Sequence, residues 1–417
     1  PRDPTRFCLF VVDSPCREAR PAGAADGGED GWQQQFLALR RSQAERLWQL
    51  ARQALDTKRC GLALQLATEA LREDPDHAPA RRLLGYEQVD GQWCPAFAAR
   101  QKQRGYVWHG RFGWLHKEDV PRYDAGARRF GSGWITDAED ARRRQRIANG
   151  WRVPTDHYLV TTNDGLEGGV QLAARLEQFY QIWQQLFADY CLDTTAKRRL
   201  RDSGSLPATS DRQHAIYYFR SRAEYNQALR RQQPLIEKTL GIYFDTSRRG
   251  YFFAGPEQSA ETLYHEATHQ LFHETRRVAK LVGRRNNFWI VEGIATYMES
   301  LAEQPGYWTV GGFDAGRMPA ARFRLLDDGY YIPLQQLTRM GVDDLQRRAD
   351  LAKLYSQVAG LTAFLSHYDG GRYRDALLEC LIAVYTDTAD DTTLATLTGC
   401  SYTELDRQYR AFLESGK

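Results

Sequence analysis

The sequence predicts an α+β fold in which a small mixed β-sheet is followed by a helical lobe and preceded by a helical hairpin and short β units. Three observations lead to this prediction. Segments of β-branched and aromatic residues alternate with amphipathic helices between residues 157 and 253, only helical patterns follow residue 258, and a helical repeat occupies residues 41–84. Strands and helices separated in this way along a chain are typical of the α+β class.

Composition restricts the classes of function. The 417 residues allow two or three domains, and 42% hydrophobic with 26% charged residues is typical of a globular protein. The net charge of +3 is small, and the basic runs 142–144 and 197–199 are flanked by acidic residues, which argues against nucleic-acid binding. The seven cysteines contain no C-x-x-C pair, and no apolar stretch approaches the roughly 18 residues of a transmembrane segment.

Two segments with different compositions begin the chain. Residues 1–31 are rich in Gly, Ala, Pro and acidic residues, and we expect them to be poorly ordered. Residues 32–88 match one tetratricopeptide-like repeat of two helices, with Gly61 at the turn. Because at least three repeats are usually needed for a solenoid, we expect a structural cap here, with docking of a protein partner as the alternative.

A Gly-Trp repeat occupies residues 89–150. Trp93, Trp114 and Trp134 recur about every 20 residues, and each follows a nearby glycine. Glycine and aromatic residues at this spacing predict small β-hairpins in which the tryptophans fill a core, although stacking of carbohydrate on exposed tryptophan is the alternative.

Residues 151–417 carry the remaining elements and form one predicted domain. The predicted strands are 157–162, 215–219, 241–244 and 251–253, the last two as a hairpin. The predicted helices are 166–190, 222–232, 258–275, 288–303, 333–340, 348–368, 371–386 and 401–414. We therefore expect a small sheet, then a lobe made only of helices, with a cleft between them.

An H-E-x-x-H motif spans His265, Glu266 and His269 within an apolar helical segment. Residues four apart on an α-helix lie on one face, so both imidazoles can bind one metal ion. Catalytic Zn²⁺ takes three protein ligands and a water molecule, and Glu266 can accept a proton from that water as a general base. His273 continues the row, but about 12 Å of helical rise separates it from His265, so we interpret it as a surface or core histidine.

A third ligand is expected from Glu292, which lies 23 residues after His269. Residues 284–287 have the composition of a loop and residues 288–301 have helical apolar spacing, so a second helix can pack back against the first. The alternative is a buried helix with two structural histidines. That arrangement would leave Glu292 in an apolar helix face without a partner, which costs free energy.

With these residues, residues 151–417 resemble the gluzincin (thermolysin-like) clan of zinc metallopeptidases, and the resemblance as a whole extends over the chain from about residue 32. The segment from Trp289 to Glu299 is similar to the W-x-x-E-G-x-A-x-Y-x-E signature of MA-like predicted peptidases. Segments 265–272 and 368–377 resemble a bacterial family of predicted peptidases described only as a domain of unknown function. The resemblance implies a zincin-like sheet and helical lobe and is specific for the clan, but it does not specify a substrate.

The resemblance also implies roles for individual residues. It implies one Zn²⁺ per chain, with Glu266 as the base. The implied zinc ligands are His265, His269 and Glu292. The sequence departs from the thermolysin-type pattern at Thr296, where that pattern has an acid that orients a ligand histidine. Glu299 lies on the same helical face as Glu292 and is a candidate for this contact, with a solvated acid at the helix end as the alternative.

A later helix of the clan supplies a Tyr or His that stabilises the developing oxyanion. The segment 354–360 resembles the clan segment in that position, and we select Tyr355 for this role. Tyr330, Tyr331 and His367 remain alternatives, and all four residues could instead be core or rim aromatics.

These observations predict a zinc-dependent peptidase that hydrolyses peptide or protein substrates. One alternative is an inactive peptidase-like protein that binds partners through residues 32–88. Another is a zinc hydrolase that acts on a non-peptide bond.

Overall fold

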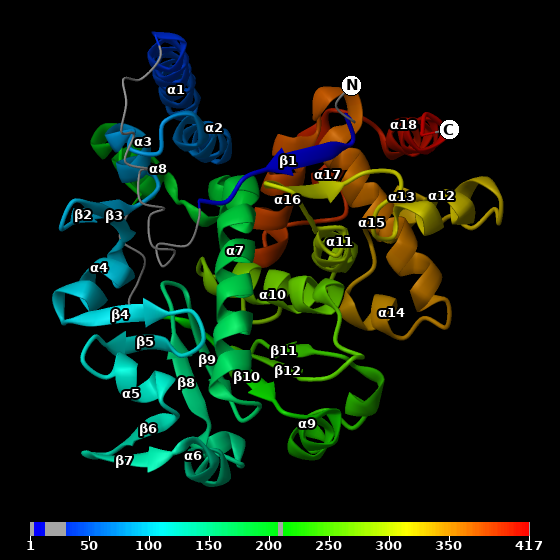
Figure 1. Ribbon diagram of the computed structural model, residues 1–417. Coiled ribbons are helices and arrows are strands. Elements are labelled where there is room, and N and C mark those ends of the chain that lie inside the picture. Colours follow the sequence, from blue (N-terminus) through cyan, green and yellow to red (C-terminus); the bar gives the residue numbers. More distant parts are fainter. Residues whose placement is uncertain (1–3, 13–30, 207–211, 417) are drawn as a thin grey trace. The chain divides into compact units, whose positions relative to one another are not determined.

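The structure is a computed structural model that describes residues 4–12, 31–206 and 212–416 (Figure 1). The fold is α+β, with 54% helix and 15% strand, as the sequence predicts. Two compact units divide the chain. Unit 1 consists of Pro1–Leu9 and Ser259–Lys417, and unit 2 consists of Phe10–Gln258. The predicted segment boundaries at residues 31, 88 and 150 therefore all fall inside unit 2.

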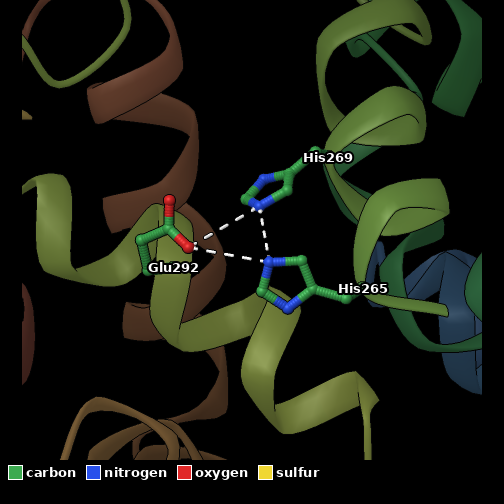
Figure 2. Close-up of side chains that lie close together, drawn as sticks. All are labelled: His265, His269 and Glu292. Carbon is green, nitrogen blue, oxygen red and sulfur yellow. Dashed lines mark hydrogen bonds and ion pairs between the residues drawn. The ribbon is translucent and has the colours of Figure 1, made fainter. Parts of the chain in front are cut away.

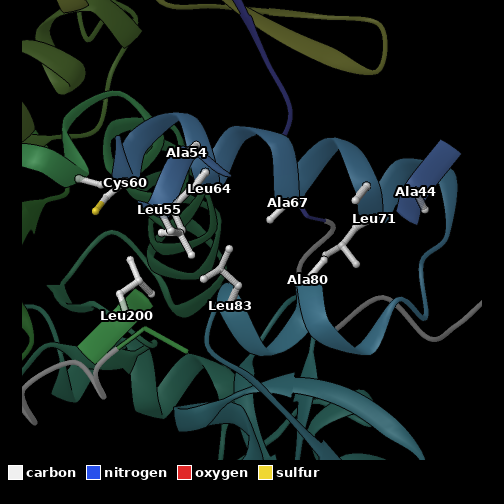
Figure 3. Close-up of a cluster of buried hydrophobic side chains, with 13 residues drawn as sticks. Ala44, Ala54, Leu55, Cys60, Leu64, Ala67, Leu71, Ala80, Leu83 and Leu200 are labelled. Atoms are coloured by element: carbon white, nitrogen blue, oxygen red, sulfur yellow. The ribbon is translucent and has the colours of Figure 1, made fainter. Parts of the chain in front are cut away.

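Unit 2 begins with a helical region built on small residues. Its helices are α1 (Gly31–Asp56), α2 (Cys60–Glu73) and α3 (Ala78–Leu83). Their buried side chains are mostly alanine and leucine, which allows α1 and α2 to pack closely (Figure 3). The sequence predicted Gly61 at the turn between these helices. This prediction is wrong, because Gly61 lies in the first turn of α2. A Cβ at Gly61 would lie 2.7 Å from the backbone oxygen of Gln185, so glycine allows α2 to approach a neighbouring helix.

The Gly-Trp segment forms three antiparallel hairpins, which confirms that prediction. The hairpins are β2 (Tyr86–Val89) with β3 (Gln92–Pro95), β4 (Tyr106–His109) with β5 (Gly113–His116), and β6 (Ala127–Phe130) with β7 (Gly133–Thr136). Each is followed by a short helix, namely α4 (Ala96–Gln103), α5 (Val120–Asp124) and α6 (Asp137–Arg143). Trp114 packs edge-on against Phe97 and Trp108, with ring centroids 6.1 and 5.6 Å away. The aromatic residues therefore pack against one another, as in a small core.

A five-stranded mixed sheet completes unit 2. Its strand order is β11-β12-β10-β9-β8, with β9, β10 and β12 parallel and both outer strands antiparallel. The strands are β8 (Trp151–Pro154), β9 (Tyr158–Thr162), β10 (His214–Phe219), β11 (Ile242–Phe244) and β12 (Arg249–Phe253). The remaining helices are η1 (Ile147–Asn149), α7 (Leu166–Cys191), α8 (Thr194–Ser203), α9 (Arg222–Leu229) and η2 (Ile236–Lys238). Helix α7 packs on β8 and β9, where a Cβ at Gly169 would lie 2.7 Å from the Thr162 methyl group.

Unit 1 contains a three-stranded antiparallel sheet that the sequence did not predict. Its order is β1-β14-β13, with β1 (Arg6–Leu9), β13 (Ala302–Gln304) and β14 (Tyr307–Gly311). The predicted disorder of residues 1–31 is therefore wrong for residues 6–9, and residues 13–30 lie outside the described residues. The prediction of helix alone after residue 258 is also wrong at β13 and β14. Strand β1 gains its hydrogen bonds from β14, about 300 residues later, so no local pattern indicates it.

The rest of unit 1 is mainly helical. Its helices are α10 (Ala260–Glu274), α11 (Phe288–Met298), α12 (Met318–Leu326), α13 (Leu334–Leu337), α14 (Val342–Gln346), α15 (Leu351–His367), η3 (Tyr368–Gly370), α16 (Arg374–Tyr385), α17 (Thr393–Thr398) and α18 (Tyr402–Glu414). Every residue of α11 is buried. A Cβ at Gly293 would lie 2.6 Å from the Thr362 hydroxyl oxygen, so this glycine permits close packing of α11 on α15.

Two further findings concern only the described residues. None of their helices is long and apolar enough to span a membrane. Their six cysteines are all free.

Candidate metal centre

Helix α10 carries the H-E-x-x-H motif as predicted. Its N-terminus is capped by Ser259, whose hydroxyl oxygen accepts the Thr262 backbone N–H at 3.2 Å. Apolar residues on one side of the helix are buried, including Leu263, Ala267 and Leu271. This packing holds the opposite face, with both motif histidines, toward the site.

Helix α11 brings Glu292 to the same point (Figure 2). The Nε2 atoms of His265 and His269 are 3.2 Å apart, and Oε2 of Glu292 lies 3.7 Å from each of them. The Glu292 side chain is 8% exposed, and the two histidine side chains are 14% and 17% exposed. The three residues therefore form a His-His-Glu group that could hold a metal ion.

The donor set fits Zn²⁺. Ligand atoms that lie about 2.0–2.2 Å from a tetrahedral zinc ion are roughly 3.3–3.6 Å from one another, close to the three distances in this group. Two imidazole nitrogens at 3.2 Å direct lone pairs at each other unless a proton or cation lies between them. Two imidazoles and one carboxylate also match the ligand types of catalytic zinc sites.

Glu299 orients one of these histidines. Its Oε1 lies 2.9 Å from Nδ1 of His265, so the Nδ1 proton is held by the carboxylate and Nε2 faces His269 and Glu292. Arg317 in turn donates to both oxygens of Glu299, at 2.6 and 2.9 Å. The structure thus supplies the contact that Thr296 cannot, because the Thr296 hydroxyl donates to backbone carbonyls of its own helix.

The carboxylates of this group and His265 stabilise one another's charged forms, as the directions of their pKa shifts indicate. Burial raises the pKa of Glu292, but His269 and His265 outweigh burial and lower that pKa to about 2. Burial lowers the pKa of His265, while its hydrogen bond to Glu299 and the nearby Glu266 charge raise that pKa above the ordinary value overall. Burial likewise raises the pKa of Glu299, but His265 and Arg317 lower it overall. Glu292 and Glu299 are therefore ionised at neutral pH.

Tyr355 of α15 lies beside the carboxylate of Glu292. Gln346 Nε2 donates to the Tyr355 hydroxyl at 3.2 Å and to Oε1 of Glu292 at 3.3 Å. The pKa of Tyr355 is raised by burial first and by the Glu292 charge second, so the phenol keeps its proton at neutral pH. The hydroxyl is therefore a neutral donor next to a candidate ligand.

The other aromatic candidates make contacts elsewhere in unit 1. The Tyr330 hydroxyl donates to Asp350 at 3.0 Å, and the Tyr331 hydroxyl donates to Asp406 at 2.5 Å. His367 is buried, with Nε2 2.7 Å from the Tyr297 hydroxyl. None of these contacts involves the His-His-Glu group, so Tyr355 remains the candidate that the structure brings closest to it.

Sequence patterns did not point to Arg317 and Gln346. Arg317 lies in the loop before α12, and Gln346 is the last residue of α14, a helix that was not predicted. Neither belongs to a motif, and both reach the site only through packing. The row of histidines on α10 continues to His273, which is not part of the His-His-Glu group among the described residues.

Comparisons with known proteins do not identify a family. No family model matches the chain, and no curated protein matches it. The likeness to H-E-x-x-H zinc sites therefore rests on the His265, His269 and Glu292 geometry alone.

Proposed function

We propose that this protein is a zinc-dependent hydrolase of peptide bonds. The observation that carries the proposal is the convergence of His265, His269 and Glu292 from two packed helices, with Glu266 directly after His265 on α10. Three protein ligands leave one position for water or substrate, which is typical of catalytic rather than structural zinc.

Each residue then has a specific role. A bound Zn²⁺ would polarise the scissile carbonyl and lower the pKa of a water molecule. Glu266 accepts the proton of the attacking water and delivers it to the leaving amine. The Glu299 carboxylate holds the Nδ1 proton of His265, which keeps the ring in one tautomer. Tyr355 donates a hydrogen bond to the oxygen on which negative charge develops.

Removal and return of the metal test this function. The native protein is dialysed against a chelator and assayed with a broad library of peptides by mass spectrometry, before and after Zn²⁺ is added back. We expect cleavage to disappear with the metal and to return at about one zinc per chain. A protein that binds zinc but cleaves no peptide in the library would instead support a partner-binding protein or a hydrolase of non-peptide bonds.

Substitution of Tyr355 by phenylalanine tests the oxyanion role. One lost donor costs about 10²–10³ in kcat in comparable sites, and we expect at least a hundredfold decrease here. KM, zinc content and melting temperature should stay close to wild type, because the ring keeps its packing. Tyr330→Phe is the matched control, since the Tyr330 hydroxyl donates to Asp350 and should leave kcat unchanged. A Tyr355→Phe enzyme with wild-type kcat would remove this residue from the mechanism.

A further inference from the structure

Unit 2 contains a cavity of about 320 Å³ that the proposed hydrolysis does not use. Its wall combines residues from α2, the first two Gly-Trp hairpins, the loop between β8 and β9, and one face of α7. All of these elements belong to unit 2. The volume lies at the lower end of the range of small-ligand sites.

Side-chain amides on α7 bind polypeptide backbone at this wall. Gln181 pairs with both backbone groups of Val12, since its Oε1 accepts the N–H at 2.9 Å and its Nε2 lies 3.5 Å from the carbonyl oxygen. Gln185 donates from Nε2 to the carbonyl oxygen of Phe10 at 2.8 Å. A side-chain amide that accepts from the N–H and donates to the carbonyl oxygen of one residue is well suited to bind a peptide backbone. Val12, Gln181 and Gln185 all line the cavity.

The row of amides on α7 is longer than the stretch of described residues, 10–12, that is bound to it. Gln178 lies one turn before Gln181 on α7, and Gln184 also lines the cavity. Within the described part of the chain, the side-chain amides of Gln178 and Gln184 have no hydrogen-bond partner. The rise from Gln178 to Gln185 is about 10 Å, which matches about three residues of extended chain. A further peptide segment could therefore hydrogen-bond to the two remaining amides.

Next to Gln178, the cavity wall is acidic. His157 neutralises Glu177, because its backbone N–H and its Nδ1 each lie 2.7 Å from one oxygen of that carboxylate. Asp156 is different. Its Oδ1 accepts the Phe97 backbone N–H at 3.2 Å, and no described residue donates to its other oxygen. Burial first and the Glu177 charge second raise the pKa of Asp156 to about 6, and they outweigh the nearby His157 and Arg100, which lower it.

The rest of the wall suits the stem of a basic side chain. Trp108 and Trp114 line the cavity with Leu64 and Leu84. Aliphatic stems of Lys and Arg pack on apolar surfaces of this kind, and their charged heads are attracted to indole faces and to carboxylates.

We propose that this cavity binds a peptide segment that carries a lysine or arginine. Gln178 and Gln184 hydrogen-bond to the peptide backbone, and the basic side chain passes Trp108 and Trp114 to reach Asp156. Residues 10–12 of the chain itself show the type of backbone contact that this face of α7 makes. The site is independent of the metal centre, and it makes unit 2 a docking module for basic segments of a partner or substrate protein.

Fluorescence polarisation of short labelled peptides tests the proposal. The full chain carries Glu266→Gln, so that the probes are not consumed, and the probes are capped Ala-Ala-Arg-Ala-Ala and Ala-Ala-Glu-Ala-Ala. We expect only the arginine peptide to bind in the micromolar range. Asp156→Asn and Gln178→Leu should each weaken binding at least tenfold. The matched controls are Asp202→Asn and Gln171→Leu, which change exposed residues outside the cavity and should have no effect.

Three outcomes would overturn the proposal. These are equal binding of both peptides, unchanged binding by Asp156→Asn and Gln178→Leu, or equal affinity for free arginine amide, which offers a cation without a chain to pair with the amides. Hydrogen exchange is also measured on the protein that keeps native Asp156 and Gln178, so this test does not depend on whether the cavity variants fold. Addition of the arginine peptide should slow exchange in residues 155–157 and 178–185, and exchange unchanged there would also refute the site.

Discussion

Replacing Glu266 with glutamine is expected to abolish peptide cleavage while the protein keeps its zinc. The amide has nearly the same shape as the carboxylate but cannot accept the proton of the attacking water. Proton transfer by a positioned side chain contributes about 10²–10⁴ to a rate, so kcat/KM should decrease by at least that factor. The measurement combines kcat/KM on a fluorogenic peptide with elemental analysis of zinc. Nothing in the ligand set changes, so zinc should remain near one per chain.

A control on the same helix separates this effect from a general loss of charge. Glu261 is exposed in the first turn of α10, one helical turn before His265, and it is not part of the His-His-Glu group, so Glu261→Gln should retain wild-type kcat/KM. An active Glu266→Gln enzyme would show that another group moves the proton. If the wild type is inactive as well, the hydrolase function itself is wrong and the zinc group would serve binding or structure.

Replacing His269 with alanine is expected to remove the metal. The substitution leaves His265 and Glu292 as the two remaining candidate ligands. It removes His269 Nε2, which lies 3.2 Å from Nε2 of His265 and 3.7 Å from Oε2 of Glu292. Zinc measured after dialysis should decrease from about one per chain to less than one-tenth. Zinc added to the wild type should raise its melting temperature, because a ligand that binds only the folded state stabilises that state. The variant should lack this increase.

His273→Ala provides the comparison within the same helix. His273 lies four residues beyond His269, on the last turn of α10, and its removal should leave zinc content unchanged. Full zinc in His269→Ala would refute the ligand assignment. Loss of zinc in both variants would show that unfolding of α10, rather than loss of a ligand, releases the metal, and circular dichroism of the two proteins distinguishes these cases.

Local sequence patterns predicted several parts of the structure that depend on neighbours along the chain, although they missed the short β13–β14 hairpin. The spacing of His265 and His269 predicts a shared helical face, because side chains four apart on a helix always lie together. Hairpins with Gly-Trp turns were predicted for a similar reason, since turn and register are set within about ten residues. Glu292 was found because an ionisable residue in an apolar helix requires a partner.

Contacts between distant segments were decided by the tertiary structure alone. Strand β1 gains its hydrogen bonds from β14, so the composition of residues 6–9 says nothing about its pairing. Arg317 and Gln346 reach Glu299 and Glu292 because helices pack in one arrangement, and no spacing along the chain encodes that arrangement. The sequence by itself therefore determined which residues can bind a metal, since that property depends on residue type and helical period. Packing of the helices determined which residues orient those ligands, because orientation depends on a few ångströms between side chains that are far apart in the chain.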